Sequence, residues 1–438
     1  MKEIKKRRME LIIIVAVLAL AILVVSVVSD GIINGGEDES ADQEPEQTVL
    51  ELVYAYQNPQ WNAAIEDCVE KFEEAHPDIR IEYEVNYEHK VYEDILSKKI
   101  ARNELGDIVQ LKTPLGYAQS DVLGEISREV ANLVTSIYVY DEKIYGVGAV
   151  QATSGILYNK KIFEKYNLKE PENWWEFLEI CRTLRDQGVV PIGVAGSELW
   201  HMEYWVNHFF RTDVLSKNEN WLADCADGNV SWTDQEPAQM MSHLSELFSE
   251  RYVNGDWQTT VDGSLAYKMS EEEIAMIYTG PWTARSIKQL DADMDLGWFY
   301  VPDEHGTVYA GENLDTFWSV TKECAADGKK YEAAMTFLKW FYQADNYSSL
   351  CKSTFTYPLT KDADLSAETD IQADIQQSFL EADRKIPLYI GNEDTPQDFE
   401  KNMLAIVQEI LADECSEKEG LKRIQKLWKQ CQKLEDVP

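Results

Sequence analysis

The chain has 438 residues, 45% of them hydrophobic, and a formal net charge of −37 at pH 7. This length predicts two domains or one large domain with two lobes. Residues 1–29 carry five basic and two acidic side chains, so the acidic charge belongs to the rest of the chain. Such a surface repels nucleic acid and anionic lipid, and it therefore excludes nucleic acid as a partner.

The amino terminus has the pattern of a membrane anchor. Basic residues at positions 2 and 5–8 precede an apolar run from Leu11 to Val28, which is long enough for a short transmembrane helix. The basic flank predicts that the bulk of the chain lies outside the cytoplasm. Because Ser26–Ser29 is a poor cleavage site, residues 1–29 are predicted to be an uncleaved signal anchor, with a cleaved signal peptide as the alternative. Residues 30–47 are polar and predict a disordered tether.

The first folded stretch predicts a βαβ unit. A strand at 49–54, a helix at 61–75 with one apolar face, and a strand at 79–85 follow one another. Such a unit implies a parallel sheet, and ligands bind beyond the carboxyl ends of parallel strands. The candidates in this position are Tyr56, Gln57, Asn58 and Trp61. Packing at the start of the helix is the alternative for Trp61.

The central stretch, residues 140–163, predicts a passage from one lobe to another. Asp141–Lys143 give a turn signal, and strands are predicted at Ile144–Val147 and Gly155–Tyr158. A helix is predicted to begin at Asn159. Gly146 and Gly148 indicate a bend or a close approach of another chain segment. A β-meander within one domain is the alternative.

Four blocks, DEKIYGV, GILYNKKIFEKYNL, ENWWEFLEICRTLRDQGVVPIGVAG and YTGPW, occur in this order along the chain. Together they resemble the maltose-binding-like family, the extracellular solute-binding proteins of carbohydrate ABC transporters. The chain departs from the family pattern at Gly148, where proline is common, and at Asn173, where threonine is usual. The resemblance implies an α/β, two-lobed periplasmic-binding-protein-like fold with a hinge and an interlobe cleft, here preceded by the transmembrane helix. The implied first lobe is 48–150 plus about 286–345, and the second is 151–285 plus about 346–438.

The second lobe is predicted to contain a helix at 174–187 and a buried strand at 189–194. Polar and aromatic residues then cluster between the end of that strand and the next helix. In the family, a tryptophan at the position of Trp200 commonly lines the cleft, whereas Trp205, Phe209 and Phe210 have helix-core packing as their alternative. The cluster consists of Glu198, Trp200, His201, Glu203, Tyr204 and Trp205.

The resemblance implies further residues at the cleft. Trp282 follows Gly280 and Pro281 at a predicted helix start and is the strongest candidate for stacking on a sugar. Gln110, Lys112 and Thr113 fall in the family's turn after a strand at 107–111, and Glu312, Asn313 and Asp315 fall in a turn between Gly311 and a strand at 316–320. Tyr357 and Pro358 match a segment that crosses back between the lobes. The predicted ligand-binding set is Gln57, Asn58, Trp61, Thr113, Trp200, Trp282, Glu312, Asp315 and Tyr357.

These residue types suit a sugar, which offers an apolar C–H face to flat aromatic rings and a rim of hydroxyls to planar polar groups. The implied function is extracytoplasmic binding of a sugar or oligosaccharide and its delivery to the permease of an ABC importer. The implied protein is a monomer at the extracellular face of the bacterial cytoplasmic membrane, without a cofactor, metal or enzymatic activity. Pro114 and Leu115 replace a polar pair of the maltose-binding relatives, so the implied site is not that of maltose.

Two other functions stay open. A membrane-anchored glycoside hydrolase needs two carboxylates flanking a cleft, and Glu203, Glu312 and Asp315 are available. A ligand-sensing subunit for a membrane receptor kinase needs the same fold. The nucleotide-binding motif G-x-x-x-x-G-K-[ST] and the hydrolase motifs H-E-x-x-H and G-x-S-x-G do not occur.

The seven cysteines are scattered, and no C-x-x-C occurs. They therefore predict neither a disulfide framework nor a zinc site. Most are expected to be small buried apolar residues. Two pairings stay open, Cys324 with Cys351 and Cys415 with Cys431.

Overall fold

The computed structural model describes residues 47–54, 59–83, 92–364, 366–387, 390, 395–396 and 399–435. Residues 47–438 form one compact unit with two α/β lobes. The predicted anchor and tether fall on residues 1–46, outside the described residues. Within the described residues, every helix is too short or too polar to cross a membrane.

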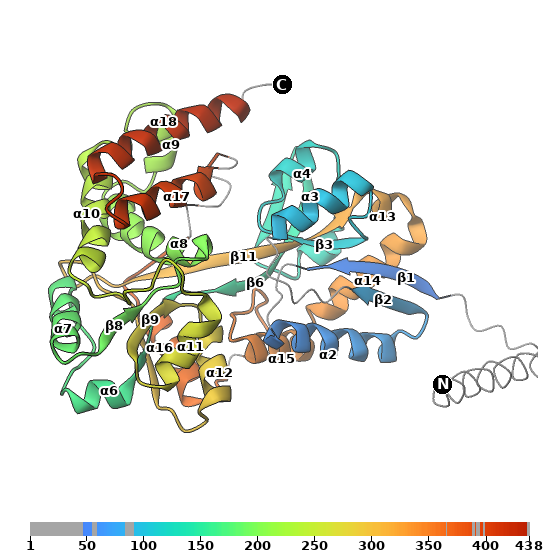
Figure 1. Ribbon diagram of the computed structural model, residues 1–438. Helices are drawn as coiled ribbons and strands as arrows, with labels where there is room; N and C mark the ends of the chain where they lie inside the picture. The colour runs from blue at the N-terminus through green and yellow to red at the C-terminus, as the bar shows by residue number, and fades with distance from the viewer. Residues whose placement is uncertain are drawn as a thin grey trace, which may run out of the picture. The chain divides into compact units, whose positions relative to one another are not determined.

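The first lobe is built on a mixed sheet in the order β2-β1-β3-β11-β6-β5 (Figure 1). β1 pairs in parallel with β2 and β3, as the βαβ pattern predicted, whereas β11 runs antiparallel to β3 and β6. A short strand, β4, also pairs with β11. The strands are β1 (Thr48–Val53), β2 (Ile79–Tyr83), β3 (Ile108–Leu111), β4 (Leu123–Gly124), β5 (Ile137–Tyr140), β6 (Lys143–Ala152) and β11 (Tyr309–Thr321).

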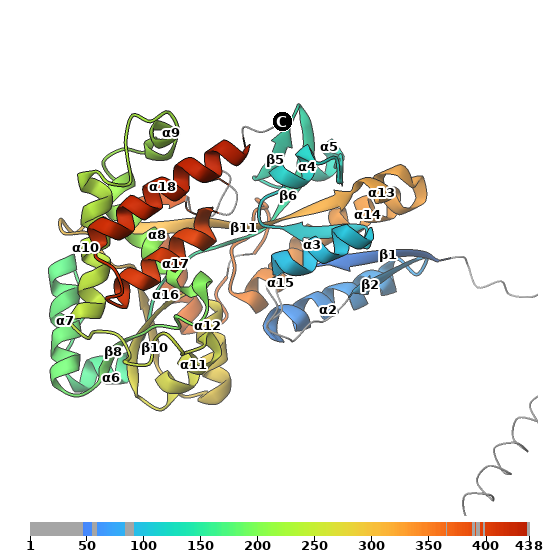
Figure 2. The same ribbon diagram turned by 45° about the horizontal axis from the view of Figure 1, so that its top comes forward.

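Helices cover both faces of the first sheet, because side chains alternate between its faces along each strand. Leu50 and Leu52 pack in one cluster with α2 and α14, and Val53 and Val109 pack in another with α3. Figure 2 shows α2 and α3 on opposite sides of β1. The helices of this lobe are α2 (Pro59–Ala75), α3 (Tyr92–Arg102), α4 (Leu115–Gln119), α5 (Arg128–Ala131), α13 (Lys322–Ala326), α14 (Gly328–Phe341) and α15 (Ala344–Thr354).

The second lobe is built on a four-stranded sheet in the order β10-β7-β9-β8. Every residue of the central strand β9 is buried, since helices cover both faces. β8 and β9 are parallel, so both end at the same edge of the sheet. The strands are β7 (Gly155–Asn159), β8 (Val190–Gly193), β9 (Ile274–Thr279) and β10 (Leu296–Phe299). A further strand, β12 (Arg384–Pro387), pairs in parallel with the first residues of β11.

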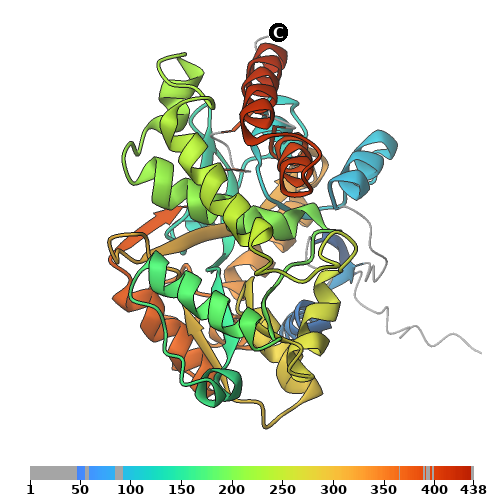
Figure 3. The ribbon, with the colours of Figure 1, turned by 60° about the vertical axis from the view of Figure 1, so that its left-hand side comes forward.

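The helices of the second lobe form two layers. α7, α8, α10, α17 and α18 pack on one face of the sheet, and α11, α12 and α16 on the other. Figure 3 shows the last two helices, in red, beside each other. The helices are α6 (Lys160–Lys165), α7 (Trp174–Asp186), α8 (Leu199–Phe209), the π-helix η1 (Phe210–Leu215), α9 (Trp221–Ala226), α10 (Gln235–Ser249), α11 (Asp262–Ser270), α12 (Trp282–Leu290), α16 (Asp370–Glu381), α17 (Phe399–Leu411) and α18 (Glu417–Glu435).

The departure from the family pattern at Asn173 has a local explanation. Asn173 is the N-cap of α7, and its side-chain oxygen accepts a hydrogen bond from the backbone N–H of Glu176 at 3.0 Å. The Glu176 carboxylate in turn accepts from the backbone N–H of Glu172 at 2.9 Å. Asparagine and threonine both supply an oxygen at this position, so either residue starts the helix.

The lobes divide at different points from those predicted. β10, expected in the first lobe, pairs antiparallel with β7 and completes the second sheet before the chain crosses back on β11. α15, expected in the second lobe, packs against α2 of the first. The predicted turn at Gly311–Asp315 is also absent, because these residues continue β11. They stay extended because Asn313 and Leu314 pair with Ala152 and Gln151 of β6.

Among the described residues, three segments cross between the lobes: β6, β11 and residues 356–360. Figure 1 shows β6 and β11 running from one lobe into the other. Residues 356–360 join them through Tyr357, which exchanges two backbone hydrogen bonds with Gln151, at 2.6 and 3.0 Å. A Cβ added at Gly146 would lie 3.0 Å from the Phe317 Cβ, so the predicted close approach is present. The passage predicted at residues 140–163 is thus confirmed, with a longer first strand.

The seven cysteines are present as thiols, and six of them are buried. Neither of the two pairings left open by the sequence is formed. Burial raises the pKa of the Cys68 and Cys351 thiols to about 12. These thiols therefore stay protonated and act as small core residues, as expected.

Candidate functional site

The candidate site lies where β8 and β9 end and their following helices begin. Trp200, in the first turn of α8, is 41% exposed. Its ring meets Tyr204 edge-on at 5.9 Å and His201 at 5.6 Å. Trp205, Phe209 and Phe210 are at most 1% exposed, which confirms their helix-core reading. α8 therefore buries one aromatic face and leaves one tryptophan open to solvent.

Trp282 is the second tryptophan at this edge. It is the first residue of α12, it is half-buried, and it packs against the main core of the second lobe. Its ring folds over Gly280, where an added Cβ would lie only 2.1 Å from the indole. A side chain at position 280 would therefore displace the ring, which gives a physical reason for glycine two residues before the tryptophan.

A polar cluster that includes His201, the ring neighbour of Trp200, joins the two helices at this edge. The backbone N–H of Asp262, at the start of α11, donates to Glu198 Oε2 at 2.7 Å. The backbone N–H of Ala195 approaches His201 Nδ1 at 3.5 Å, while His201 Nε2 faces Asp262 Oδ1 at 3.5 Å. These contacts tie the starts of α8 and α11 together beside the exposed indole.

The same cluster contains two groups with displaced pKa values. Burial lowers the pKa of the His201 imidazole to about 3, so this residue is neutral at physiological pH. Burial, followed by the negative charge of Glu198, raises the pKa of the Asp262 carboxyl to about 7. At neutral pH the Asp262 carboxyl group is thus partly protonated, and in its protonated form it donates a hydrogen bond.

The first lobe reaches the second through Lys112, which directly follows β3. Its Nζ lies 3.3 Å from both carboxylate oxygens of Glu400 in α17 and 3.6 Å from Glu203 Oε2 in α8. Both helices belong to the second lobe. Thr113, the neighbouring candidate, is half-buried.

The remaining predicted residues separate into three groups. Trp61 is 2% exposed and belongs to the core of the first lobe. The alternative interpretation of Trp61, packing at the start of its helix, is therefore confirmed. Tyr357 lies in a crossing segment, where its ring stacks on Phe379 at 4.9 Å and its hydroxyl donates to Ile375 O at 3.3 Å. Others fall outside the description: Tyr56, Gln57 and Asn58 entirely, and Glu312, Asn313 and Asp315 in their side chains.

Glu400, Asp262 and Arg211 were not singled out from the sequence. Arg211 is buried in the π-helix and donates from Nη2 to the Tyr278 hydroxyl at 3.2 Å. Glu400 lies in the first turn of its helix, and acidic residues there are common for helix-dipole reasons alone. No local signal could have separated these residues from ordinary helix positions.

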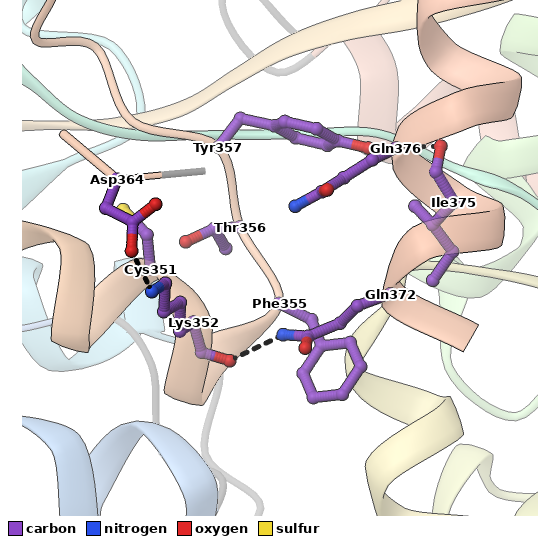
Figure 4. Close-up of a pocket in the computed structure, with 9 residues that line it drawn as sticks. All are labelled: Cys351, Lys352, Phe355, Thr356, Tyr357, Asp364, Gln372, Ile375 and Gln376. Carbon is purple, nitrogen blue, oxygen red and sulfur yellow. Dashed lines mark hydrogen bonds and ion pairs between the residues drawn. The ribbon is translucent and has the colours of Figure 1, made fainter. Parts of the chain in front are cut away.

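Described residues of α15 line two cavities. Figure 4 shows a small one at the end of α15, where Gln372 Nε2 donates to Lys352 O at 3.0 Å and Lys352 Nζ contacts Asp364. A larger one, about 400 Å³, lies between α2, α15 and Arg285 of α12. Its lining mixes polar and apolar side chains, with Trp340 as the aromatic member, and it includes none of the predicted binding residues.

Residues 67–377 match the family model described as bacterial extracellular solute-binding protein. The match covers most of the chain, and the protein belongs to this family.

Two curated relatives are similar in sequence to most of this chain. The "Multiple sugar-binding protein" of Streptococcus mutans is 21% identical over 322 residues, covering 70% of this chain and 76% of the relative. The "Melibiose/raffinose/stachyose-binding protein MelE" of Bacillus subtilis is also 21% identical over 322 residues, covering 69% of this chain and 70% of the relative.

Solved structures share the fold. A "Chitin oligosaccharide binding protein" superposes with a TM-score of 0.77 at 19% identity, covering 88% of this chain and 99% of that one. A sugar transporter protein from Bacillus licheniformis in complex with stachyose superposes with a TM-score of 0.71 at 18% identity, covering 88% of this chain and 100% of that one. At these identities the likeness establishes the fold alone.

Proposed function

We propose that this protein binds a sugar or oligosaccharide outside the cytoplasm and delivers it to the permease of an ABC importer. The observation that carries the proposal is the exposed ring of Trp200 at the sheet edge where β8 and β9 both end, with Trp282 at the same edge. Membership of the solute-binding family and relatives whose names are those of sugar-binding proteins support the same reading.

The chemistry of this edge suits a neutral oligosaccharide. An indole face covers the C–H face of a pyranose ring, and two tryptophans provide two such surfaces. Carboxylates such as Glu198 accept from hydroxyls, and a protonated Asp262 carboxyl donates to them. Micromolar affinity requires about −8 kcal/mol. Two stacked rings and several hydrogen bonds supply that amount after the costs of ordering.

The proposal includes the amino terminus and the partners. Residues 1–29 anchor the protein in the cytoplasmic membrane through their basic and apolar pattern, and residues 30–47 act as the tether. The folded part then works as a monomer at the extracellular face. A strongly acidic surface suits a protein that must not adhere to anionic lipid headgroups beside it.

Binding is favoured over glycoside hydrolysis because Glu203, one of the carboxylates considered for catalysis, is engaged by Lys112. A general acid needs a raised pKa and a free approach to the glycosidic oxygen. The proposed protein therefore releases its sugar unchanged. A sensing role would use the same site and would differ only in the membrane partner.

Thermal unfolding in the presence of sugars tests the proposal. The panel contains melibiose, raffinose, stachyose and chitin oligosaccharides, with amino acids, peptides and polyamines as the comparison set. A ligand at 100 times its dissociation constant adds about 2.7 kcal/mol to the free energy of unfolding, which raises Tm by a few degrees. Stabilisation by a sugar class without release of reducing ends supports the proposal. Stabilisation by another solute class alone would contradict the sugar assignment.

A further inference from the structure

One lysine joins the two lobes through charged contacts. Lys112 follows β3 of the first lobe, and its Nζ lies within 3.3 Å of Glu400 and 3.6 Å of Glu203 in the second. The two carboxylates come from α17 and α8, which pack against each other. One positive charge thus sits between two negative charges that belong to the opposite lobe.

The acidic half of this contact is fixed in place within the second lobe. Glu203 is 12% exposed, and Asn207 Nδ2, one turn later in α8, donates to its Oε1 at 3.4 Å. The Asn207 amide also accepts from the backbone N–H of Ile390 at 3.2 Å, so it is itself held in position. Lys112 is 41% exposed and moves with the first lobe. The contact therefore forms or breaks with the distance between the lobes.

The electrostatic energy of this contact differs between the separated and the closed arrangement of the lobes. The protein carries a net charge of −37, so its two halves repel each other on average. When the lobes separate, Glu203 and Glu400 stay on neighbouring helices of the second lobe without Lys112 between them. Closing the lobes brings the cation back and relieves that repulsion.

We propose that Lys112, Glu203 and Glu400 form an interlobe latch that stabilises the closed arrangement of the lobes and so raises ligand affinity. Partly exposed ion pairs of this kind shift an equilibrium modestly, about 3- to 10-fold for the set. A ligand that binds only the closed form gains affinity by the same factor, because the binding-competent fraction increases. The effect on affinity rests on the proposed function, whereas the effect on closure does not.

Single-molecule energy transfer on the ligand-free full chain in detergent measures closure directly. One dye is placed at Arg80→Cys in β2 and the other at Glu179→Cys in α7, both exposed positions in opposite lobes. Cys415→Ser removes the one cysteine that is not buried. We expect Lys112→Met to lower the ratio of closed to open molecules about 3- to 10-fold, and Lys112→Glu to lower it further.

Lys339→Met is the matched control. This lysine is similarly exposed and pairs with Glu129, but both residues belong to the first lobe, so its loss should leave the ratio unchanged. A Lys112→Met protein whose distribution equals that of the wild type would overturn the latch. So would an equal change in the Lys339→Met control.

Affinity for raffinose, measured by calorimetry, provides the second readout. If raffinose binds, Lys112→Met should weaken it by the same factor as the closed fraction. Failure of every sugar in the panel would sink the proposed function while the energy-transfer result still decides the latch. A changed closed fraction with unchanged raffinose affinity would contradict the latch's role in binding.

Discussion

Two regions of contact between the lobes differ in the kind of interaction that they contain. Where the chain crosses, contacts are backbone hydrogen bonds such as those between Gln151 and Tyr357, backed by the stack of Tyr357 on Phe379. At Lys112, contacts are charged side chains that water partly reaches. Breaking the first kind strands polar groups in the interior, whereas water replaces the second kind at little cost. The molecule can therefore bend at the crossing segments and open at the charged contact.

The end of α15 reinforces the crossing region. Ser353 O accepts from Arg285 of α12, and Lys352 O accepts from Gln372 of α16, so two helices of the second lobe bind the last carbonyls of a first-lobe helix. Arg285 there also complements the negative end of the helix dipole. Phe355 then turns the chain at φ 58°, a left-handed conformation that a bulky residue keeps only when its surroundings impose it.

The largest effect is expected at the crossing region. Tyr357→Ala removes a half-buried ring from its stack on Phe379 and a hydroxyl from Ile375 O. We expect a loss of about 2 to 3 kcal/mol in the free energy of unfolding, measured by urea titration. Tyr357→Phe keeps the ring and should lose about 1 kcal/mol. Equal losses in both variants would show that the ring packing contributes nothing.

Replacing the exposed Trp200 should lower sugar affinity and leave the free energy of unfolding nearly unchanged. Trp200→Ala removes a 41% exposed ring, so stability should change by no more than about 0.5 kcal/mol. Affinity for the sugar that binds should fall about 10-fold or more, measured by calorimetry, because a stacking face is lost. Trp61→Ala is the reverse control, with a large loss of stability from the core of the first lobe. Unchanged sugar affinity in Trp200→Ala would remove this residue from the site.

A smaller effect is expected from the carboxyl group of Asp262. The folded pKa of Asp262 is about 7, above its ordinary 3.8. Only the folded protein keeps this proton between the two values, so the associated stability is complete below pH 3.8 and is lost as the pH rises through 7. Asp262→Asn stays uncharged and should gain about 1 to 2 kcal/mol over the wild type on going from pH 4 to pH 8.

Urea titrations of both proteins at pH 4 and pH 8 check this value. His201 titrates in both proteins and Glu198 is present in both, so their contributions largely cancel in the comparison. A difference between the variant and the wild type that is the same at both pH values would contradict a raised Asp262 pKa.

Much of the fold could be predicted from the sequence because its signals are local. The helix at α2 and the parallel βαβ unit follow from apolar periodicity, and the passage at β6 and β7 follows from a turn flanked by two strands. The predicted lobe boundary was wrong because β10 pairs antiparallel with β7, a strand more than a hundred residues earlier in the chain. The turn predicted at Gly311–Asp315 was wrong for the same reason, since pairing with β12 and β6, which are distant in the sequence, keeps these residues extended.

The site was harder to predict than the fold. Trp61 and Trp200 both follow a strand at the start of a helix, yet one ring is buried and the other is exposed. The burial of each ring depends on which helices pack over it. Trp61 lies in one core cluster with residues of α14 and α15, which come much later in the chain. Glu400 reaches Lys112 across 288 residues, which no local spacing indicates.

The most direct test of the account is fluorine NMR of protein labelled with 5-fluorotryptophan, titrated with the sugar that stabilises it most. Phenylalanine substitutions assign the resonances of Trp200, Trp282 and Trp61. The account predicts saturable shifts at Trp200 and Trp282, larger than any shift at Trp61 in the core of the first lobe. Unmoved Trp200 and Trp282 resonances at saturating sugar would contradict a binding site at the edge where β8 and β9 end.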